Sequence, residues 1–139
     1  MVNANHTSEM RTYDAAQITL VVDGQEMYGF KGGTDSVSVA YSSDKVTADP
    51  DSMGTTVFSI NNKSDGTITV NLNQQSPCCK KLGDICNSNK VVPVDLNAGT
   101  EHTWSAQAYI SKLPDMGYGD NAGVRTFAIK AADLQTEYI

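Results

Sequence analysis

The residues best suited to metal chemistry in this sequence are three cysteines and a histidine. Zinc prefers thiolate and imidazole ligands, so Cys78, Cys79 and Cys86 together with His102 form a candidate metal site. The spacing C-C-x6-C lacks the paired C-x2-C arrangement of structural zinc sites, and the other histidine, His6, lies in the polar N-terminal segment. We therefore interpret the cysteines as reduced, partly buried thiols, and we predict no metal and no cofactor.

Catalytic chemistry finds no better support. A serine or cysteine nucleophile needs a base, and His102 lies on an alternating segment with no G-x-S-x-G turn elsewhere in the chain. The sequence has no phosphate-binding loop, and no pair of carboxylates is set apart from the others. The D-P-D segment at 49–51 lacks the spaced oxygen ligands of a calcium loop. We predict that the protein is not an enzyme.

Length and charge limit the remaining classes. With 139 residues the chain is long enough for one domain with its own core. A net charge of −6 argues against general binding to nucleic-acid backbone or to an anionic membrane. No apolar run approaches the roughly 20 residues that span a bilayer. The N-terminus has no apolar leader segment, so we expect no membrane contact and a cytoplasmic site of synthesis.

The best-defined structural unit runs from Gly66 to Asn89. Its first part alternates Ile68, Val70 and Leu72 with threonine and asparagine, which predicts a strand with one buried face. Ser76 followed by Pro77 is typical of a helix start. The spacing of the next apolar residues predicts a short helix over about residues 77–88 with a stripe that covers the sheet, made of Cys78, Leu82, Ile85 and Cys86.

Further strands are predicted on both sides of this unit. Asp23-Gly24 is a tight-turn signal within a hairpin over residues 18–30, and a polar loop over residues 42–54 should end any pairing at Pro50. Trp104 is expected to anchor the core from a long strand. Other expected segments are strands at 36–41, 55–60, 91–96, 102–110 and 124–131, a hairpin loop at 61–66 leading into the next strand, a loop at 111–123, and a short strand or arm at 132–139.

These patterns define a fold class and a domain organisation. We expect a mainly β protein, with antiparallel sheets that form a β-sandwich or a barrel and one flanking α-helix. Residues 1–11 are polar and aperiodic, so we expect a flexible N-terminal arm or upstream extension there. We expect residues 12–139 to form the single β-sandwich domain.

The order of the motifs resembles the tail tube proteins of contractile-tailed bacteriophages, and it is also similar to the tubes of tailocins and secretion systems. The most specific part is G-T-I-T-V-N-L-N-Q-Q-S-P followed by a helix. The likeness extends from about residue 12 to residue 131. Its segments are T-Y-D-A-A-Q-I-T-L-V-V-D-G at 12–24, G-F-K-G-G-T-D-S-V-S-V at 29–39, K-V-T-A-D-P-D-S-M-G at 45–54, and A-Y-I-S-K-L-P-D-M-G-Y-G at 108–119.

This resemblance implies a structural protein of stacked homo-hexameric rings inside a contractile sheath, with DNA passing through the lumen during ejection without specific binding. It implies assembly in the host cytoplasm and then residence in the virion tail. The residues expected to face the lumen are Ser36, Ser38, Thr67, Thr69, Asn71 and Asn73. Those expected to form a ring-stacking loop are Asp44, Lys45, Asp49, Asp51 and Met53, and the helix with Cys78, Leu82, Ile85 and Cys86 is expected on the outer side.

Two alternatives stay open at the level of sequence. A tube subunit of a tailocin or secretion particle would share the fold and much of the physics. A monomeric β-sandwich module that binds carbohydrate or protein would need exposed aromatic side chains, for which Tyr41, Tyr109 and Tyr118 are the candidates.

Overall fold

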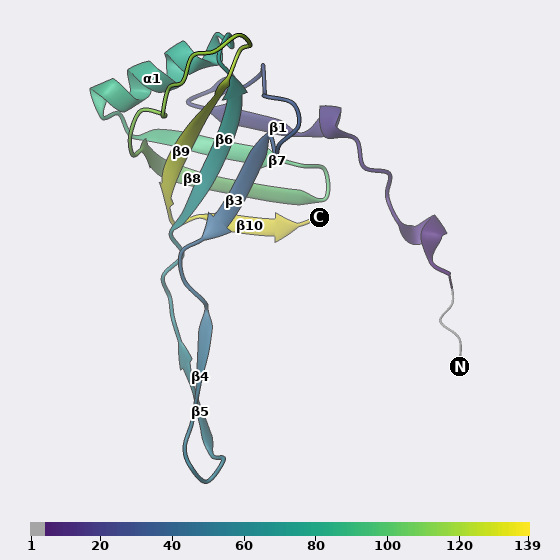
Figure 1. Ribbon diagram of the computed structural model, residues 1–139. Coiled ribbons are helices and arrows are strands. Elements are labelled where there is room, and N and C mark those ends of the chain that lie inside the picture. The colour runs from purple at the N-terminus through teal and green to yellow at the C-terminus, as the bar shows by residue number, and fades with distance from the viewer. Residues whose placement is uncertain (1–4) are drawn as a thin grey trace.

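The computed structural model describes residues 5–139, so the first four residues of the expected N-terminal arm lie outside it. Within this range the chain forms one eight-stranded antiparallel sheet, a separate two-stranded hairpin and one α-helix, α1 (Cys78–Ser88) (Figure 1). The strands are β1 (Thr19–Val22), β2 (Gln25–Glu26), β3 (Val37–Tyr41), β4 (Val46–Pro50), β5 (Thr56–Ile60), β6 (Gly66–Asn73), β7 (Val92–Asn97), β8 (Glu101–Ile110), β9 (Val124–Ala132) and β10 (Gln135–Tyr138). The predicted mainly β, antiparallel fold class with one helix is confirmed.

The large sheet folds over along β8. The strand order is β2-β1-β7-β8-β9-β6-β3, and β10 also pairs with β8. The first part of β8 pairs with β10 and the last part with β9, so β3, β6 and β9 cross over β1, β7 and β8 (Figure 1). Over residues 5–139 the sheet does not close into a barrel, because β2 and β3 remain at its two ends.

The core fills the space between these layers. Alternation is strict in β6, where every second residue is buried, and β7 follows the same rule. The buried apolar side chains that make up the centre of the core are Leu20, Val22, Ile68, Val70, Leu72, Leu82, Val92, Val94, Phe127 and Ile129. Burial of such side chains, at roughly 1.5–3 kcal/mol each, provides the main driving force for the fold.

The predicted helix signals are confirmed. The start lies one residue later than expected, with Pro77 as the N-cap and Cys78 as the first helical residue. Ser76 Oγ accepts a hydrogen bond from the Cys78 N–H at 3.3 Å and donates one to the Tyr28 carbonyl at 2.6 Å, so the serine joins the first turn of α1 to the chain after β2. The helix ends at Ser88 and is capped by Asn89, which is left-handed with φ 52°, and Lys90 N–H donates to the Ile85 carbonyl. The expected turn at Asp23-Gly24 is also present, with φ 51° and 78°.

The expectation for Trp104 is wrong. The pairing of β7 with β8 shifts between Val92↔Ala108 and Val94↔Ser105, so an extra residue of β8 is accommodated by a bulge. The bulge reverses the faces of the strand: Ser105 is buried before it and Ala108 after it. Trp104 consequently lies on the outer face, where its ring stacks on His102 at a centroid distance of 4.6 Å.

The expectation for residues 42–66 is wrong in two respects. The polar segment at 42–54 contains β4, which pairs with β5 as far as Pro50↔Thr56, so Pro50 takes part in the pairing rather than preventing it. An edge position permits this because the missing N–H can face solvent. Residues 61–66 do not form a hairpin loop, since β6 pairs with β3 and β9 instead of β5.

Candidate assembly surfaces

The β4–β5 hairpin projects from the sheet and carries one apolar face. Register places Val46 beside Ile60 and Ala48 beside Phe58, and partners that lie opposite each other share a face. We call these four residues the hairpin face. Val46 is 52%, Phe58 68% and Ile60 76% exposed, and Figure 1 shows the hairpin extending away from the rest of the fold. Exposed apolar surface of this kind marks an interaction site.

The five residues predicted for ring stacking all lie on this hairpin or at its base. Asp44 and Lys45 precede β4, Asp49 lies on the side opposite the hairpin face, and Asp51 and Met53 form the tip. Asp51 Oδ1 accepts hydrogen bonds from the Met53 and Thr55 N–H groups, both at 2.9 Å. This carboxylate therefore organises the tip, where the Met53 side chain is 88% exposed.

The residues predicted to face a lumen lie on the outer face of the β3–β6–β9 layer. Pairing places Ser38 beside Thr69, and Thr67, Thr69, Asn71 and Asn73 alternate with the buried residues of β6. Ser36 lies just before β3, and its carbonyl accepts the Asn71 N–H at 3.0 Å. The structure thus brings the predicted residues together on one side of the sheet.

Strand β9 completes this face with residues that the sequence reasoning did not include. Thr126 Oγ1 donates to Asn71 Oδ1 at 2.7 Å, and Lys130 Nζ donates to Thr67 Oγ1 at 3.1 Å. Ala128 lies beside Thr69. The signal was present, because the alternation of Phe127 and Ile129 already assigned their neighbours in β9 to the opposite side. We call the outward residues of β3, β6 and β9 the polar sheet face.

Helix α1 packs its apolar stripe inward. Cys78, Leu82 and Ile85 are at most 4% exposed, and Cys86 packs against the same core. A partner on the outside would instead meet residues such as Lys80 and Asp84, which form an exposed ion pair at 3.1 Å.

The structure does not gather the candidate metal ligands into a site. The Cys78 thiol lies beside the backbone of β2, accepting from Tyr28 N–H at 3.4 Å, and burial raises the pKa of the Cys79 thiol above its ordinary value. His102 Nε2 lies 2.8 Å from Asp95 Oδ1 on β7. In the part of the chain that the structure describes, no three side chains of the ligating types lie close enough together to hold a metal ion. The same residues contain no helix long and apolar enough to cross a membrane.

The three tyrosines proposed for a ligand-binding module are separated. Tyr41 lies on β3, and its hydroxyl donates to the Leu134 carbonyl at 3.2 Å. Tyr109 lies on β8 opposite Lys130, and Tyr118 lies in the loop at 111–123. They therefore form no shared aromatic platform of the kind that carbohydrate recognition uses.

An arginine that the sequence reasoning missed lies beneath that loop. Arg125 is 6% exposed because it lies on the core-facing side of β9, the same side as Phe127 and Ile129. Its guanidinium donates to the carbonyl oxygens of Val124 at 2.9 Å and Gly117 at 3.1 Å, and it lies 5.3 Å from the centre of the Tyr118 ring. The sequence signal for this residue was a positively charged side chain at a position that the alternation of β9 assigns to the buried face.

A shallow groove of about 380 Å³ opens at the other end of the sheet. It is lined mainly by apolar and aromatic side chains, among them Ile18, Val37, Val39, Tyr41, Leu96 and Tyr138. The groove offers a second surface on which another chain could pack, separate from the hairpin face.

No family model and no curated protein matches this sequence. Solved structures do match, at low identity. A chain of the sheath–tube complex of an extracellular contractile injection system, PVC, in its extended state aligns with TM-score 0.66 and 13% identity, covering 98% of this chain and 100% of that one.

Two further chains from such particles align over most of their length. The PVC sheath/tube terminator gives TM-score 0.59 and 15% identity, covering 92% of this chain and 98% of that one. The tube-terminating cap of the anti-feeding prophage, AFP, gives TM-score 0.58 and 11% identity, covering 94% and 93%. This chain therefore has the fold found in tube-related structural proteins of contractile injection systems.

Proposed function

We propose that this protein is the tube subunit of a contractile tail or injection particle, and that its copies form hexameric rings that stack into a hollow tube. The observation that carries the proposal is the hairpin face. An isolated two-stranded hairpin is marginally stable in water. This one also exposes Phe58 and Ile60, so it requires a surface of another chain to cover it.

The energetics favour a contact between copies. Complete burial of a side chain such as Phe58 or Ile60 contributes roughly 1.5–3 kcal/mol. The hairpin projects from one end of the fold (Figure 1). A contact between this hairpin and a different surface of the next copy is therefore heterologous. Heterologous contacts generate rings or open filaments, which are the two elements of a tube.

The polar sheet face supports the assignment of the lumen. In a ring, the β3 edge of one copy can continue into the sheet of its neighbour, which removes an unpaired edge strand. The inner wall would then consist of Ser38, Thr67, Thr69, Asn71 and Asn73, with β9 beside them. This wall consists mainly of hydroxyl and amide groups, with Lys130 of β9 as a cation among them, and hydroxyl and amide groups bind phosphates weakly, so DNA can pass without being retained.

The outer side of the tube follows from the same orientation. Helix α1 lies at the end of the fold away from the hairpin, and we assign its exposed side, with the Lys80–Asp84 pair, to the contact with a surrounding sheath (Figure 1). The similarity to a chain from a sheath–tube complex supports a sheath as the outer partner. We place assembly in the host cytoplasm and the finished tube in the particle; capsid and packaging genes beside this gene would identify a phage tail, and their absence a tailocin or secretion particle.

A second candidate function is termination of the tube. Its support is the similarity to a sheath/tube terminator and to a tube-terminating cap, whose TM-scores of 0.59 and 0.58 are close to each other. A terminator would form a single ring that binds a tube end and stops its growth, whereas a tube subunit would add further rings.

Sedimentation velocity and negative-stain microscopy over a concentration series separate these functions. A tube subunit gives rings and then tubes whose length grows with concentration. A terminator gives rings that do not stack. A monomer that persists at millimolar concentration would contradict both and support the binding module. The variant to compare with the unaltered protein is Phe58→Ser. Because Phe58 is exposed in the monomer, this change should abolish assembly and leave the melting temperature of the monomer unchanged.

A further inference from the structure

Arg125 is a buried cation without a carboxylate partner. Its side chain is 6% exposed, yet among residues 5–139 no Asp or Glu oxygen lies within 4.0 Å of its guanidinium. Its hydrogen bonds go to two backbone carbonyl groups, of Val124 and Gly117. Arginine is rarely buried unless it is paired, since removing an unpaired charge from water is unfavourable. Asp115 lines the same depression as Arg125 but forms no ion pair with it, so in the described part of the isolated subunit the guanidinium is not paired with an anion.

The guanidinium is also open to an incoming group. It has five N–H donors, and two of them are used in the hydrogen bonds to Val124 and Gly117. Two depressions meet at Arg125. One is lined by the loop, including Asp115, Gly119 and Asn121, and the other mainly by apolar side chains, including Leu113 and Met116. We call this combination of a cation and an apolar rim the Arg125 pocket.

The Arg125 pocket and the hairpin lie at opposite ends of the fold. Both are reached along β6: Gly66 begins the strand where the chain returns from the hairpin, and Leu72, near its other end, pairs with Arg125. Eight residues of strand span about 25 Å. Figure 1 shows the hairpin descending from one end while α1 and the loop at 111–123 lie at the other. Copies arranged head to tail thus bring the hairpin tip of one towards the pocket of the next.

The hairpin tip carries the complementary chemistry. Asp51 uses Oδ1 to accept two backbone N–H groups within the tip, and Oδ2 makes no hydrogen bond in the described chain. Met53 beside it is 88% exposed. The tip therefore presents one carboxylate oxygen and one long apolar side chain, which match the cation and the apolar rim of the Arg125 pocket.

We propose that, in the stacked tube, the hairpin tip of one subunit inserts into the Arg125 pocket of a subunit in the next ring, with the Asp51 carboxylate bound to the Arg125 guanidinium. The inference rests on the proposed tube function and names the surface that receives the hairpin. It also explains why a buried arginine is unpaired in the single chain, because its partner arrives with the next ring.

Cysteine cross-linking tests the contact directly. The variant Ser52→Cys/Asn121→Cys, in a Cys79→Ser/Cys86→Ser background, places one thiol at the tip and one at the pocket. Oxidation of its tubes should give a ladder of covalent oligomers, since a head-to-tail contact repeats without end. Ser38→Cys/Asn121→Cys is the control and should give no ladder. Tubes that form normally but give no Ser52–Asn121 ladder overturn the inference while the proposed function stands.

Charge removal gives an independent test. Asp51→Asn keeps the Oδ1 acceptor that organises the tip and removes the charge, so it should raise the protein concentration needed for stacking about tenfold. Asp84→Asn, on the exposed side of α1, removes the same charge outside the hairpin and should change this concentration little. In Arg125→Met, which keeps a long apolar stem, the effect of Asp51→Asn should disappear.

Each remaining outcome decides one of the two proposals. Equal effects of Asp51→Asn in the presence and in the absence of Arg125 contradict the contact. A cross-link in the variant Ser52→Cys/Thr136→Cys would place the tip in the groove instead. Melting temperatures of the dispersed variants report folding separately. A protein that forms neither rings nor tubes overturns both the contact and the tube function.

Discussion

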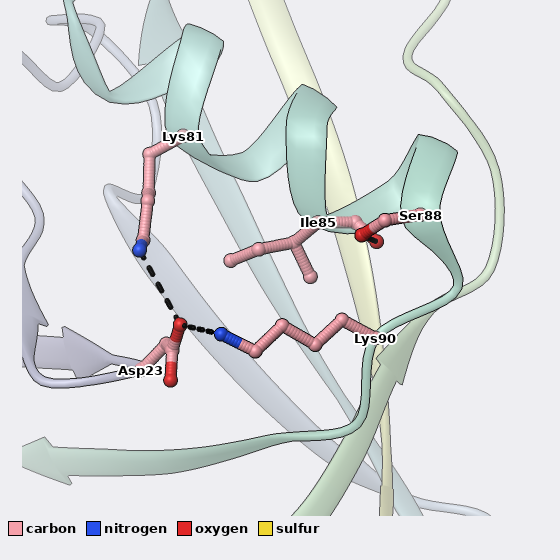
Figure 2. A network of polar contacts seen from close by, with 5 residues as sticks. All are labelled: Asp23, Lys81, Ile85, Ser88 and Lys90. Atoms are coloured by element: carbon pink, nitrogen blue, oxygen red, sulfur yellow. Dashed lines mark hydrogen bonds and ion pairs between the residues drawn. The ribbon is translucent and has the colours of Figure 1, made fainter.

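Asp23 Oδ2 lies 2.7 Å from the Nζ atom of Lys90 and thereby joins the turn after β1 to the end of helix α1 (Figure 2). The same oxygen lies 3.3 Å from Nζ of Lys81, which lies within helix α1. A single carboxylate thus bridges two ammonium groups from different points of the helical segment. Because Asp23 is held in a left-handed turn with φ 51°, its position is fixed by the backbone before either lysine contributes.

This bridge makes stability depend on pH. The hydrogen bonds from Lys90 and then Lys81 hold the pKa of Asp23 below its ordinary value. A lowered pKa in the folded state stabilises the protein above the ordinary carboxyl pKa of about 4 and ceases to do so as the pH falls through the folded value. Asp23→Asn should therefore lower the melting temperature near neutral pH, and the difference from the unaltered protein should vanish towards about pH 2.

A matched control lies on the helix itself. Asp84→Asn removes an ion pair with Lys80 whose side chains are 66% and 84% exposed, so its effect on the melting temperature should be small at every pH. Asparagine also accepts the left-handed conformation, so the Asp23 variant keeps its turn. If both variants show the same pH dependence, the bridge does not stabilise the fold.

The close approach of Gly29 to Ser76 gives a second prediction. A Cβ atom at residue 29 would lie 2.7 Å from Ser76 Oγ, and the φ of +76° there is itself unfavourable for other residues. Gly29→Ala should lower the free energy of unfolding by more than about 1 kcal/mol. Ser76→Ala should lower it by about 1–3 kcal/mol, because the hydrogen bonds from the Cys78 N–H and to the Tyr28 carbonyl are both lost. Urea unfolding monitored by circular dichroism measures both.

The double variant separates the two causes. In Gly29→Ala/Ser76→Gly the clash with Oγ and Cβ is removed, and the backbone strain at residue 29 remains. Compared with the single variants Gly29→Ala and Ser76→Gly, the double variant should lose less free energy of unfolding than the sum of the two single losses. Full additivity would show that strain alone accounts for the cost at Gly29.

The central unit of the fold was predictable because its signals are local. The β6 alternation, the Ser76-Pro77 start and the apolar stripe of α1 depend on neighbours within a few residues, and all three are confirmed, the helix start to within one residue. Trp104 was misplaced because a bulge in β8 changes the phase of the alternation, and a bulge leaves no mark in an otherwise regular pattern.

The candidate surfaces were predictable only in part. The polar sheet face follows from period-two alternation in β3 and β6, so its residues were identified without knowledge of the pairing. The hairpin was missed because β4 is exposed along its whole length and carries no buried–exposed alternation. Arg125 was missed because its role depends on a loop folding over the end of β9, which is a tertiary contact.

Added charge on the polar sheet face should make a tube retain DNA. Thr69 and Ala128 are cross-strand neighbours on this face, so Thr69→Lys/Ala128→Lys would place two ammonium groups side by side on the proposed wall. Assembled tubes of the variant should bind double-stranded DNA fragments more tightly than unaltered tubes, whose wall already carries Lys130, and should release them only at higher salt. Filter retention of labelled DNA across a salt series measures this.

The control for that experiment uses the other side of the molecule. Asp84→Lys adds positive charge to the exposed side of α1 and should bind DNA on the outside of the tube, where nuclease can digest it. DNA held by the Thr69 and Ala128 variant should be protected by the surrounding wall. If nuclease digests the DNA bound to both variants equally, the assignment of the polar sheet face to the lumen is wrong.

The β4–β5 hairpin supplies the sharpest prediction, because only one of its two sides is the hairpin face and the other side serves as a control. Ile60→Thr keeps a β-branched residue suited to a strand but removes apolar contact area from a side chain that is 76% exposed. The monomer should therefore unfold at an unchanged temperature, while ring and tube formation shift to much higher concentration. Val57→Thr makes a similar change on the opposite side of β5, at a residue that is 62% exposed, and should leave assembly nearly unaffected. Equal loss of assembly in the two variants would show that both sides of the hairpin are covered, and no loss in either would show that its apolar side is not an interface.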